Sequence, residues 1–481
     1  MNSASRIDPS SLSSLRRCLS GTLLTTGDDG YETARRIHNG MIDKHPSVIA
    51  RCLGTADVVN ALDLAARHGL EVTVRSGGHN VAGRAVCDGG MMVDLSAMKG
   101  SHVDPKARTV RVQAGLTWGE FNRETQLHGL GTTGGAVSST GVAGLTLGGG
   151  FGFLMGKYGF TIDNLRSAEL VTAKGKVLHA SNEENGELFW GVRGGGGNFG
   201  VVTSFEFALH PVGPMVHGGS IAYPFSQSTE LLRFYRELTS SPTDDLTVAA
   251  GLTHSPDGSG QKLAALLVCH CGASAEALGS LDSIKAFGTP AADRLGPIPY
   301  TALNQMLDAS FPKLALNYWK SSFVPELTED VMAVLVGQFA RCPSPMSKLI
   351  LEHFHGAAVR PKPSDTAFPH RDAGYSVLII AQWRDAADNE RNITWAKETF
   401  ALLEPFTRRS VYSNYMGDDE GLTRVRLAYG ENFVRLQKLK DRYDPDNLFR
   451  HNQNIPPSDW PKQPDLDWAR TGVLTAIEAD R

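Results

Sequence analysis

Residues 75–83 are Arg75-Ser76-Gly77-Gly78-His79-Asn80-Val81-Ala82-Gly83, and they directly follow an apolar run, residues 70–74, that predicts a buried strand. The glycines permit backbone with positive φ and let a ligand approach the main chain closely. Several amide groups that converge in such a turn form a concavity suited to a diphosphate. His79 in this setting is expected to be an exposed, nucleophilic imidazole. From this loop alone, an ordinary turn with a surface histidine also stays open.

The residues before this loop predict a β-α-β unit. Residues 47–52 form an apolar run typical of a strand, and Thr55 is the expected N-cap of a helix that continues to His68. Gly69 follows as the expected stop of that helix. The glycine loop therefore lies at the carboxyl end of a strand, where ligands bind in α/β units.

A second and longer glycine stretch extends from residue 134 to residue 154, with the sequence GGAVSSTGVAGLTLGGGFGFL. Each glycine in a regular element costs about 0.5–1 kcal/mol relative to alanine. A core does not require so many glycines, so the chain needs bare backbone here. Main-chain contacts to a bound ligand, such as one that carries a diphosphate, would explain that need.

The two glycine stretches, followed by Lys157-Tyr158-Gly159 and Asp163-Asn164, closely resemble the FAD-binding segments of the vanillyl-alcohol-oxidase/PCMH superfamily, and within it the berberine-bridge-enzyme-like family. The resemblance is strong over residues 47–210 and 410–457 and holds only in outline between them. It implies an α+β fold, in which a PCMH-type FAD-binding domain of two α/β subdomains adjoins a substrate domain built on an antiparallel sheet covered by helices. It also implies FAD as the cofactor, bound covalently through His79.

The expected domain boundary lies at Pro211-Val212-Gly213-Pro214, where two prolines in four residues end the glycine-rich half. Beyond it, strands such as residues 376–382 alternate with amphipathic helices such as residues 329–339. We expect an FAD-binding domain of residues 1–212, completed by residues 411–481, and a substrate-binding domain of residues 213–410.

Residues 195–200, Gly-Gly-Gly-Asn-Phe-Gly, satisfy the dinucleotide pattern GxGxxG. A Rossmann fingerprint follows a strand and opens a helix. This one follows a helix-like segment and precedes a strand, residues 201–207, so it gives little support to an NAD(P)-dependent enzyme. The resemblance instead implies FAD contacts near Gly197, Asn198 and Val202.

The cofactor-binding set implied by the glycine pattern and the resemblance comes from the two loops, the segment after residue 195 and the end of the chain. Its members are Arg75, Ser76, Gly77, Gly78, His79, Asn80, Gly83, Val137, Ser138, Thr140, Gly141, Gly144, Leu147, Gly148, Gly149, Gly150, Gly152, Asn198, Val202, Tyr415, Asn452 and Asn454. Residues 450–455 resemble the family's C-terminal segment, which packs back on the FAD domain.

A flavin oxidises its substrate by accepting a hydride while a base removes a proton from a neighbouring O–H or N–H. Tyr415 is the candidate base, because the resembled family often places a catalytic tyrosine at the corresponding position. This role requires a pKa well below the usual value of about 10, which a nearby cation or a second tyrosine would produce. A tyrosine that only contacts substrate is an equal alternative. Tyr412 is the weaker candidate, since in a strand it would face the other side.

Many members of the resembled family hold FAD through a second bond, to a cysteine four residues before a glycine that corresponds to Gly141. Val137 occupies that position here. The resemblance therefore implies a single covalent link, through His79, as in the branch typified by 6-hydroxy-D-nicotine oxidase. Thr140 occupies the position thought to gate oxygen in that family, and it leaves oxidase and dehydrogenase behaviour both open.

Composition and charge argue against several other classes of protein. A net charge of −4 gives no reason to expect nucleic acid or an anionic membrane as a partner, and no apolar run is long enough to predict a membrane span. The six cysteines are scattered, and Cys269-His270-Cys271 lacks a second ligand pair at zinc-site spacing. We expect a cytoplasmic monomer or homodimer with reduced cysteines and no metal.

The expected function is FAD-dependent oxidation of a small organic, alkaloid-like substrate at a C–H next to an amine or alcohol, with O₂ as reoxidant. Within the same family, the alternative is a sugar or oligosaccharide alcohol oxidase, which needs an open groove with aromatic side chains for stacking. A non-catalytic flavoprotein or binding module is the alternative from another class.

Overall fold

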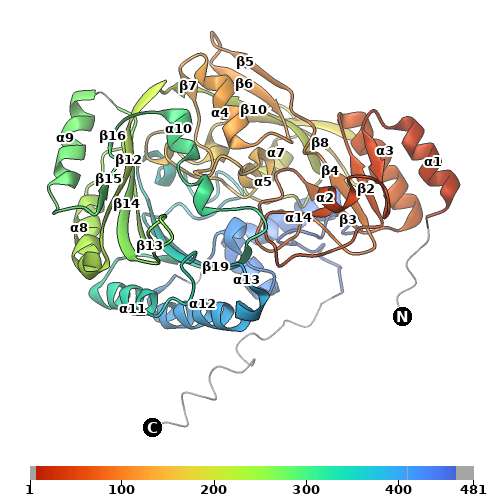
Figure 1. The fold of residues 1–481 in the computed structure, drawn as a ribbon. Coiled ribbons are helices and arrows are strands. Elements are labelled where there is room, and N and C mark those ends of the chain that lie inside the picture. The colour runs from red at the N-terminus through yellow and green to blue at the C-terminus, as the bar shows by residue number, and fades with distance from the viewer. Residues whose placement is uncertain (1–6, 273, 409, 462–481) are drawn as a thin grey trace.

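The amino-terminal sheet contains the β-α-β unit that precedes the first glycine loop. The computed structural model describes residues 7–272, 274–408 and 410–461. Across this four-stranded sheet the order is β1 (Thr22–Leu24), β2 (Val48–Arg51), β4 (Met91–Asp94) and β3 (Val72–Arg75). β2 and β3 each pair with β4 in parallel, and α3 (Thr55–His68) connects β2 to β3. The β-α-β prediction is confirmed (Figure 1).

The start of α3 differs from the prediction by one residue. Gly54 is the N-cap and Thr55 is the first helical residue, and the Thr55 hydroxyl donates to the Glu169 carboxylate at 2.8 Å. The Thr55 hydroxyl therefore binds a residue of a different sheet and does not cap the helix. Gly69 ends the helix as predicted, with a left-handed φ of 60°.

A second, five-stranded sheet completes the amino-terminal half. Its antiparallel order is β5 (Ser101–Asp104), β6 (Thr109–Gln113), β10 (Val201–Ala208), β8 (Leu165–Val171) and β9 (Val177–Ser181). The remaining elements are α1 (Pro9–Cys18), α2 (Tyr31–Arg35), α4 (Trp118–Gln126), β7 (Leu130–Gly131), α5 (Val142–Leu147), α6 (Met155–Tyr158), α7 (Gly186–Val192) and β11 (His210–Pro211). Residues 195–200 follow α7 and precede β10, which confirms that the GxGxxG pattern has the wrong orientation for a Rossmann site.

The third sheet is antiparallel and extends across residues 215–383. Its order is β15 (Ala292–Asp293), β12 (Met215–Pro224), β14 (Lys262–His270), β13 (Leu246–His254), β18 (Lys348–Phe354), β19 (Gly374–Trp383) and β17 (Leu316–Val324), with β16 (Gly296–Pro299) paired to β12. The associated helices are α8 (Ser228–Ser240), α9 (Ser274–Lys285), α10 (Tyr300–Gln305), α11 (Glu329–Ala340) and α12 (Asn389–Leu403).

The two faces of this third sheet have different neighbours. Val248, Leu351 and Ile379 point to one face and pack with Leu335 of α11 and Trp395 of α12. Figure 1 shows α8, α9, α11 and α12 along this outer side. Because side chains alternate along a strand, Glu352 and the residues that pair with it face the opposite way, toward the amino-terminal half.

The end of the chain returns to the amino-terminal half. It contains α13 (Leu422–Tyr429) and α14 (Phe433–Tyr443). Leu436, Phe449 and Ile455 belong to the same buried cluster as Leu170 and Val201. We therefore propose the division expected from sequence, an FAD-binding domain of residues 1–212 and 411–481 around a substrate-binding domain of residues 213–410. Residues 1–6 and 462–481 lie outside the described part of the chain.

Short 3-10 helices connect many of these elements: η1 (Thr161–Asp163), η2 (Phe225–Gln227), η3 (Asp308–Ser310), η4 (Gly356–Val359), η5 (Ala386–Asp388), η6 (Glu404–Phe406), η7 (Ser413–Tyr415) and η8 (Gly430–Asn432). Among the described residues, no helix combines the length and apolar character that crossing a bilayer requires.

Candidate active site

The two glycine loops touch backbone to backbone. A Cβ atom placed on Gly77 would lie 2.5 Å from the Gly141 nitrogen, and one placed on Gly141 would lie 2.5 Å from the Gly77 nitrogen. Ser76 fixes the first loop by donating to the Ala114 carbonyl at 2.6 Å. The second loop is held by backbone bonds from Trp118 to Thr140 and from Gly119 to Ser138. Segments far apart in the sequence are thus packed main chain against main chain.

This contact predicts the effect of one substitution. Gly77→Ala places a methyl group against backbone that cannot move aside, so we expect loss of about 1–3 kcal/mol of stability together with loss of retained FAD. Gly337→Ala in α11 is the matched control, because a Cβ there meets nothing within 4 Å. Thermal unfolding and the flavin absorbance after gel filtration measure both effects. Normal flavin content in the Gly77 variant would contradict the predicted role of this contact.

Unpartnered polar atoms gather along these loops. The enclosed side-chain atoms without a hydrogen-bond partner include Arg75 Nε, His79 Nε2, Asn80 Oδ1, Thr132 Oγ1, Thr133 Oγ1, Asn452 Oδ1 and Asn454 Oδ1. Buried polar groups in native proteins are satisfied by protein, water or ligand, and each of these needs a partner. A polar cofactor that lies along these loops would supply the missing partners, so the loops are chemically suited to hold FAD.

Several predicted site residues tie the cofactor loops to neighbouring segments. Ser138 contacts Asp308 through both its amide, at 2.9 Å, and its hydroxyl, at 2.5 Å. Gly148 lies against Asn414, since a Cβ there would be 2.2 Å from Asn414 Oδ1. Gly196 donates its backbone N–H to the Leu147 carbonyl at 2.8 Å. The structure therefore joins the 134–154 stretch to the GxGxxG segment and to the Tyr412–Tyr415 segment.

Glycines 83, 149, 150 and 152 each face other protein atoms and not open space. The atom that a Cβ would meet first is Ile42 Cγ1 for Gly83, Phe368 Cδ2 for Gly149, Thr161 Oγ1 for Gly150 and the Gly134 carbonyl oxygen for Gly152. A Cβ on Gly144 would meet nothing within 4 Å. These glycines thus permit close packing of the loops, whereas Gly144 leaves space in front of the backbone.

Asn198 and Val202 have structural partners. The Asn198 amide donates to the carbonyls of Gly195 and Gln453 and accepts from the Ile455 N–H, so it attaches the chain end to the first domain. Val202 is buried in that domain's core. Any FAD contact at these positions must therefore use main-chain atoms or the Val202 surface, and it remains a proposal.

The prediction that Tyr412 and Tyr415 face opposite sides is wrong. Residues 413–415 form η7, a 3-10 helix, rather than a strand. The two rings pack edge to face with centroids 4.9 Å apart. The Tyr412 hydroxyl accepts from the Gly150 N–H at 3.1 Å and from the Asn414 amide at 2.7 Å, so Tyr412 supports the glycine loop.

Tyr415 does not meet the condition for a phenolate base. Its pKa is raised well above 10 by burial, and next by the charge of Glu352. Its hydroxyl donates to Glu352 Oε1 at 3.0 Å. This ring lies in the cluster that joins Val81 and Val137 of the cofactor loops to the third sheet. Tyr415 is therefore at the predicted place but serves as a hydrogen-bond donor.

Glu352 is the residue that the sequence analysis missed. It lies on β18, and its carboxylate accepts from Tyr415 and, at 3.1 Å, from the Ser376 hydroxyl of β19. Burial raises the pKa of Glu352 to about 7, although both hydrogen bonds act to lower it. A carboxyl group that titrates near neutral pH is suited to general base catalysis. The single charge inside the apolar run 349–354 was the available sequence signal.

Lys348 lies on the same face of β18, four residues before Glu352. Burial lowers the pKa of its amine to about 7. The amine donates to the Ser310 carbonyl at 2.7 Å and lies 4.4 Å from the centre of the Phe311 ring. The inner face of the third sheet therefore presents two ionisable groups, both shifted toward neutral pH by burial.

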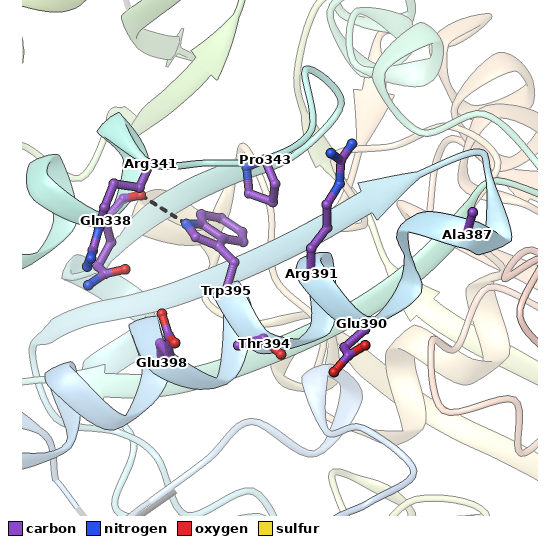
Figure 2. A pocket seen from close by; sticks show the side chains of 9 residues that line it. All are labelled: Gln338, Arg341, Pro343, Ala387, Glu390, Arg391, Thr394, Trp395 and Glu398. Carbon is purple, nitrogen blue, oxygen red and sulfur yellow. Dashed lines mark hydrogen bonds between the residues drawn. The ribbon is translucent and has the colours of Figure 1, made fainter. Parts of the chain in front are cut away.

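A groove of about 530 Å³ lies elsewhere, beside α11 and α12. Figure 2 shows Trp395 donating to the Gln338 carbonyl, while Arg391, Glu390 and Glu398 point in different directions. These residues lie on the outer side of the third sheet, away from Glu352. We therefore do not propose this groove as the site of the chemistry.

Comparisons with known proteins show which family the chain belongs to. The FAD binding domain family matches residues 46–181, and the family described as berberine and berberine like matches residues 411–456. (R)-6-hydroxynicotine oxidase of Paenarthrobacter nicotinovorans is 32% identical over 463 residues, which cover 91% of this chain and 97% of the relative. The chain belongs to the berberine-bridge-enzyme-like family of FAD-linked oxidoreductases.

Solved structures match this FAD-linked oxidoreductase over nearly its whole length. The crystal structure of 6-hydroxy-D-nicotine oxidase from Arthrobacter nicotinovorans has a TM-score of 0.82 at 31% identity, covering 91% of this chain and 98% of that one. A chitooligosaccharide oxidase has a TM-score of 0.80 at 23% identity over 93% and 99% of the two chains, a likeness of fold alone. The expected family, fold and class, an FAD-dependent oxidoreductase, are confirmed.

Proposed function

We propose that this FAD-linked oxidoreductase oxidises a small, alkaloid-like amine or alcohol, with Glu352 as the base that removes the substrate's N–H or O–H proton. The observation that supports it is the Glu352–Tyr415 pair, which faces the cofactor loops and in which the carboxyl pKa is raised to about 7. Among the relatives, (R)-6-hydroxynicotine oxidase is named for an alkaloid substrate. We propose O₂ as the electron acceptor.

Each part of the site has its own role in this proposal. The loops at residues 75–83 and 137–152 would hold FAD through their main-chain amides, and FAD, when bound, accepts a hydride from the substrate carbon. Glu352 accepts the substrate proton on a carboxylate oxygen. Tyr415 and Ser376 orient that carboxylate and, as donors, stabilise its ionised form before the proton arrives.

The accessible surface supports a small substrate over an oligosaccharide. The large hydrophobic side chains that are exposed in the described part of the chain are all aliphatic: Leu53, Leu127, Val177, Met215, Leu278, Leu314, Leu402 and Val434. Sugar-binding grooves use accessible aromatic rings for stacking. Here Trp319, Phe151 and Phe354 pack into buried clusters beside Tyr415 instead.

The compartment and the covalent link also belong to this proposal. All six cysteines are free thiols, which supports the expected cytoplasmic location. Val137, at the position where the resemblance implies a second attachment point in other members, is buried among apolar side chains. We therefore propose a single link, through His79, and a monomer or homodimer as the working form.

The test begins with an absorption spectrum before and after acid precipitation, followed by anaerobic titration with candidate substrates. We expect yellow colour that stays with the pellet, and bleaching by cyclic amines such as the enantiomers of 6-hydroxynicotine. Bleaching by chitobiose instead would favour the sugar-oxidase alternative. A protein that retains FAD but is bleached by no amine, alcohol or sugar would support a non-catalytic flavoprotein.

A further inference from the structure

His38 lies face to face with His79. The two imidazole rings are stacked with centroids 4.0 Å apart and an interplanar angle of 19°. His38 is only 5% exposed, and its Nε2, like the Nε2 of His79, is enclosed and has no hydrogen-bond partner. The His79 ring is half-buried rather than exposed as the sequence predicted. Two stacked rings that each enclose an unpartnered nitrogen are unusual in a native structure, so the pair requires a functional explanation.

The main chain fixes His38 on both sides. Its N–H donates to the Gly78 carbonyl at 2.9 Å, and its carbonyl accepts from the Leu314 N–H at 2.9 Å. The next residue, Asn39, donates its side-chain amide to the carbonyls of Val81 and Asn317. His38 is therefore clamped between the glycine loop and the start of β17. Because the side chain is also buried, the ring has little room to leave the stack.

The surroundings keep both rings neutral. Burial lowers the pKa of His79 to about 3 and that of His38 to about 4, and the positive charge of Lys313 acts in the same direction on both rings. Lys348 adds a further repulsion for a charged His38. A neutral imidazole keeps a lone pair on one ring nitrogen, which is what an attack on an electrophilic carbon requires.

We propose that His38 is a positioning residue for covalent attachment of FAD, and that its ring fixes the orientation of the His79 ring during bond formation. The inference rests on the proposed link at His79. Attachment joins a ring nitrogen of His79 to a methyl carbon of the flavin, with loss of one hydrogen from each. The two electrons released reduce the flavin and then pass, with two protons, to O₂, which becomes hydrogen peroxide.

The stacked geometry supports positioning by His38 and argues against proton transfer between the two rings. In a parallel arrangement the ring nitrogens do not point at one another, so His38 is not placed to take a proton from His79. Its contribution is then the flat surface of the ring. Phenylalanine offers such a surface without nitrogen, whereas alanine offers none.

The experiment compares His38→Ala and His38→Phe with the natural protein, each first freed of flavin by expression under riboflavin limitation and then mixed with FAD in air. Total bound FAD is read after gel filtration, and attached FAD is read as in-gel fluorescence of denatured protein over time. His45→Ala is the control, since His45 is exposed. We expect unchanged FAD binding in His38→Ala but attachment slowed by about 100-fold, the cost of a displacement of about 1 Å. His38→Phe should attach FAD within about threefold of the natural rate.

Attachment at the natural rate in His38→Ala would overturn the proposal, and so would slow attachment in His38→Phe with full FAD binding, because a ring nitrogen would then be required. Loss of FAD binding in both variants would show a merely structural role and overturn it as well. If the natural protein releases all its FAD on denaturation yet oxidises substrate, the link and this inference fail while the proposed oxidase function stands.

Discussion

Glu352→Gln is expected to slow substrate oxidation by about 10²–10⁴-fold, the usual contribution of a positioned general base. Glutamine keeps the shape of the side chain and can still accept the hydrogen bond from Tyr415, but it cannot take a proton. Rapid mixing of the oxidised, FAD-loaded variant with substrate under anaerobic conditions measures the step directly. Glu230→Gln, at an exposed position on α8, is the matched control and should be indistinguishable from the natural enzyme.

The pH dependence gives a sharper test of the same assignment. With a pKa of about 7, Glu352 is protonated and inactive as a base at low pH, so kcat/KM should rise as the pH increases through 7 and then level off. Removing the hydrogen bond in Tyr415→Phe should move this limb to higher pH, since that bond lowers the Glu352 pKa. A limb that persists unchanged in Glu352→Gln would assign the base to another group.

The raised pKa of Glu352 also makes the folding stability depend on pH in a predictable direction. Its folded pKa lies above the value of about 4.3 for an unfolded chain, so ionisation between these values opposes folding. This group therefore contributes its full stability below about pH 4 and loses it progressively as the pH rises through 7. Glu352→Gln should remove that component, so the variant gains stability relative to the natural protein as the pH rises from 5 to 8.

Lys440→Met is expected to destabilise the protein by about 3–5 kcal/mol, because it leaves the Asp444 carboxylate buried without its cation. Both side chains are fully buried, and Lys440 Nζ lies 2.6 Å from Asp444 Oδ2. The same amine donates to the Asn198 carbonyl at 3.0 Å and to the Phe449 carbonyl at 2.9 Å. One cation therefore connects α14, the GxGxxG segment and the chain end.

Urea unfolding monitored by tryptophan fluorescence measures this loss, and FAD content reports the state of the site. Lys438→Met on the same helix is the control, because Lys438 is exposed. Replacing both Lys440 and Asp444 by apolar residues should cost less than the single change, since no buried charge is then left unpaired. A single variant as stable as the control would show that Asp444 finds another partner.

Local patterns in the sequence predicted the parts of the fold that depend on near neighbours. The spacing of apolar residues in α3 and the glycine at position 69 located that helix to within one residue. The order of elements around residues 195–200 was enough to reject a Rossmann site. The order of strands in the third sheet was not predictable, because it depends on pairings such as β13 with β18, which lie about a hundred residues apart.

The candidate site, like the fold, could be predicted from the sequence only where it depends on near neighbours in the chain. The glycine loops were visible because so many glycines indicate backbone that is approached closely, and the structure shows that at most of these positions the close neighbour is protein, as where Gly77 packs against Gly141. Tyr412 was misplaced because its segment forms a 3-10 helix, whose geometry three residues cannot reveal. Glu352 was hidden in an apolar strand, and its chemistry arises only when β18 packs beside Tyr415. The partnership of His38 with His79 likewise exists only in three dimensions.

The core of the first domain contains Leu209 near the middle of the chain and Ile455 near its end. At synthesis rates of about 5–20 residues per second, roughly 250 residues and on the order of 10–50 s separate the emergence of the two from the ribosome. During that interval the first half exposes apolar surface that only the last segment covers. Nascent chains of this protein should therefore depend on chaperones.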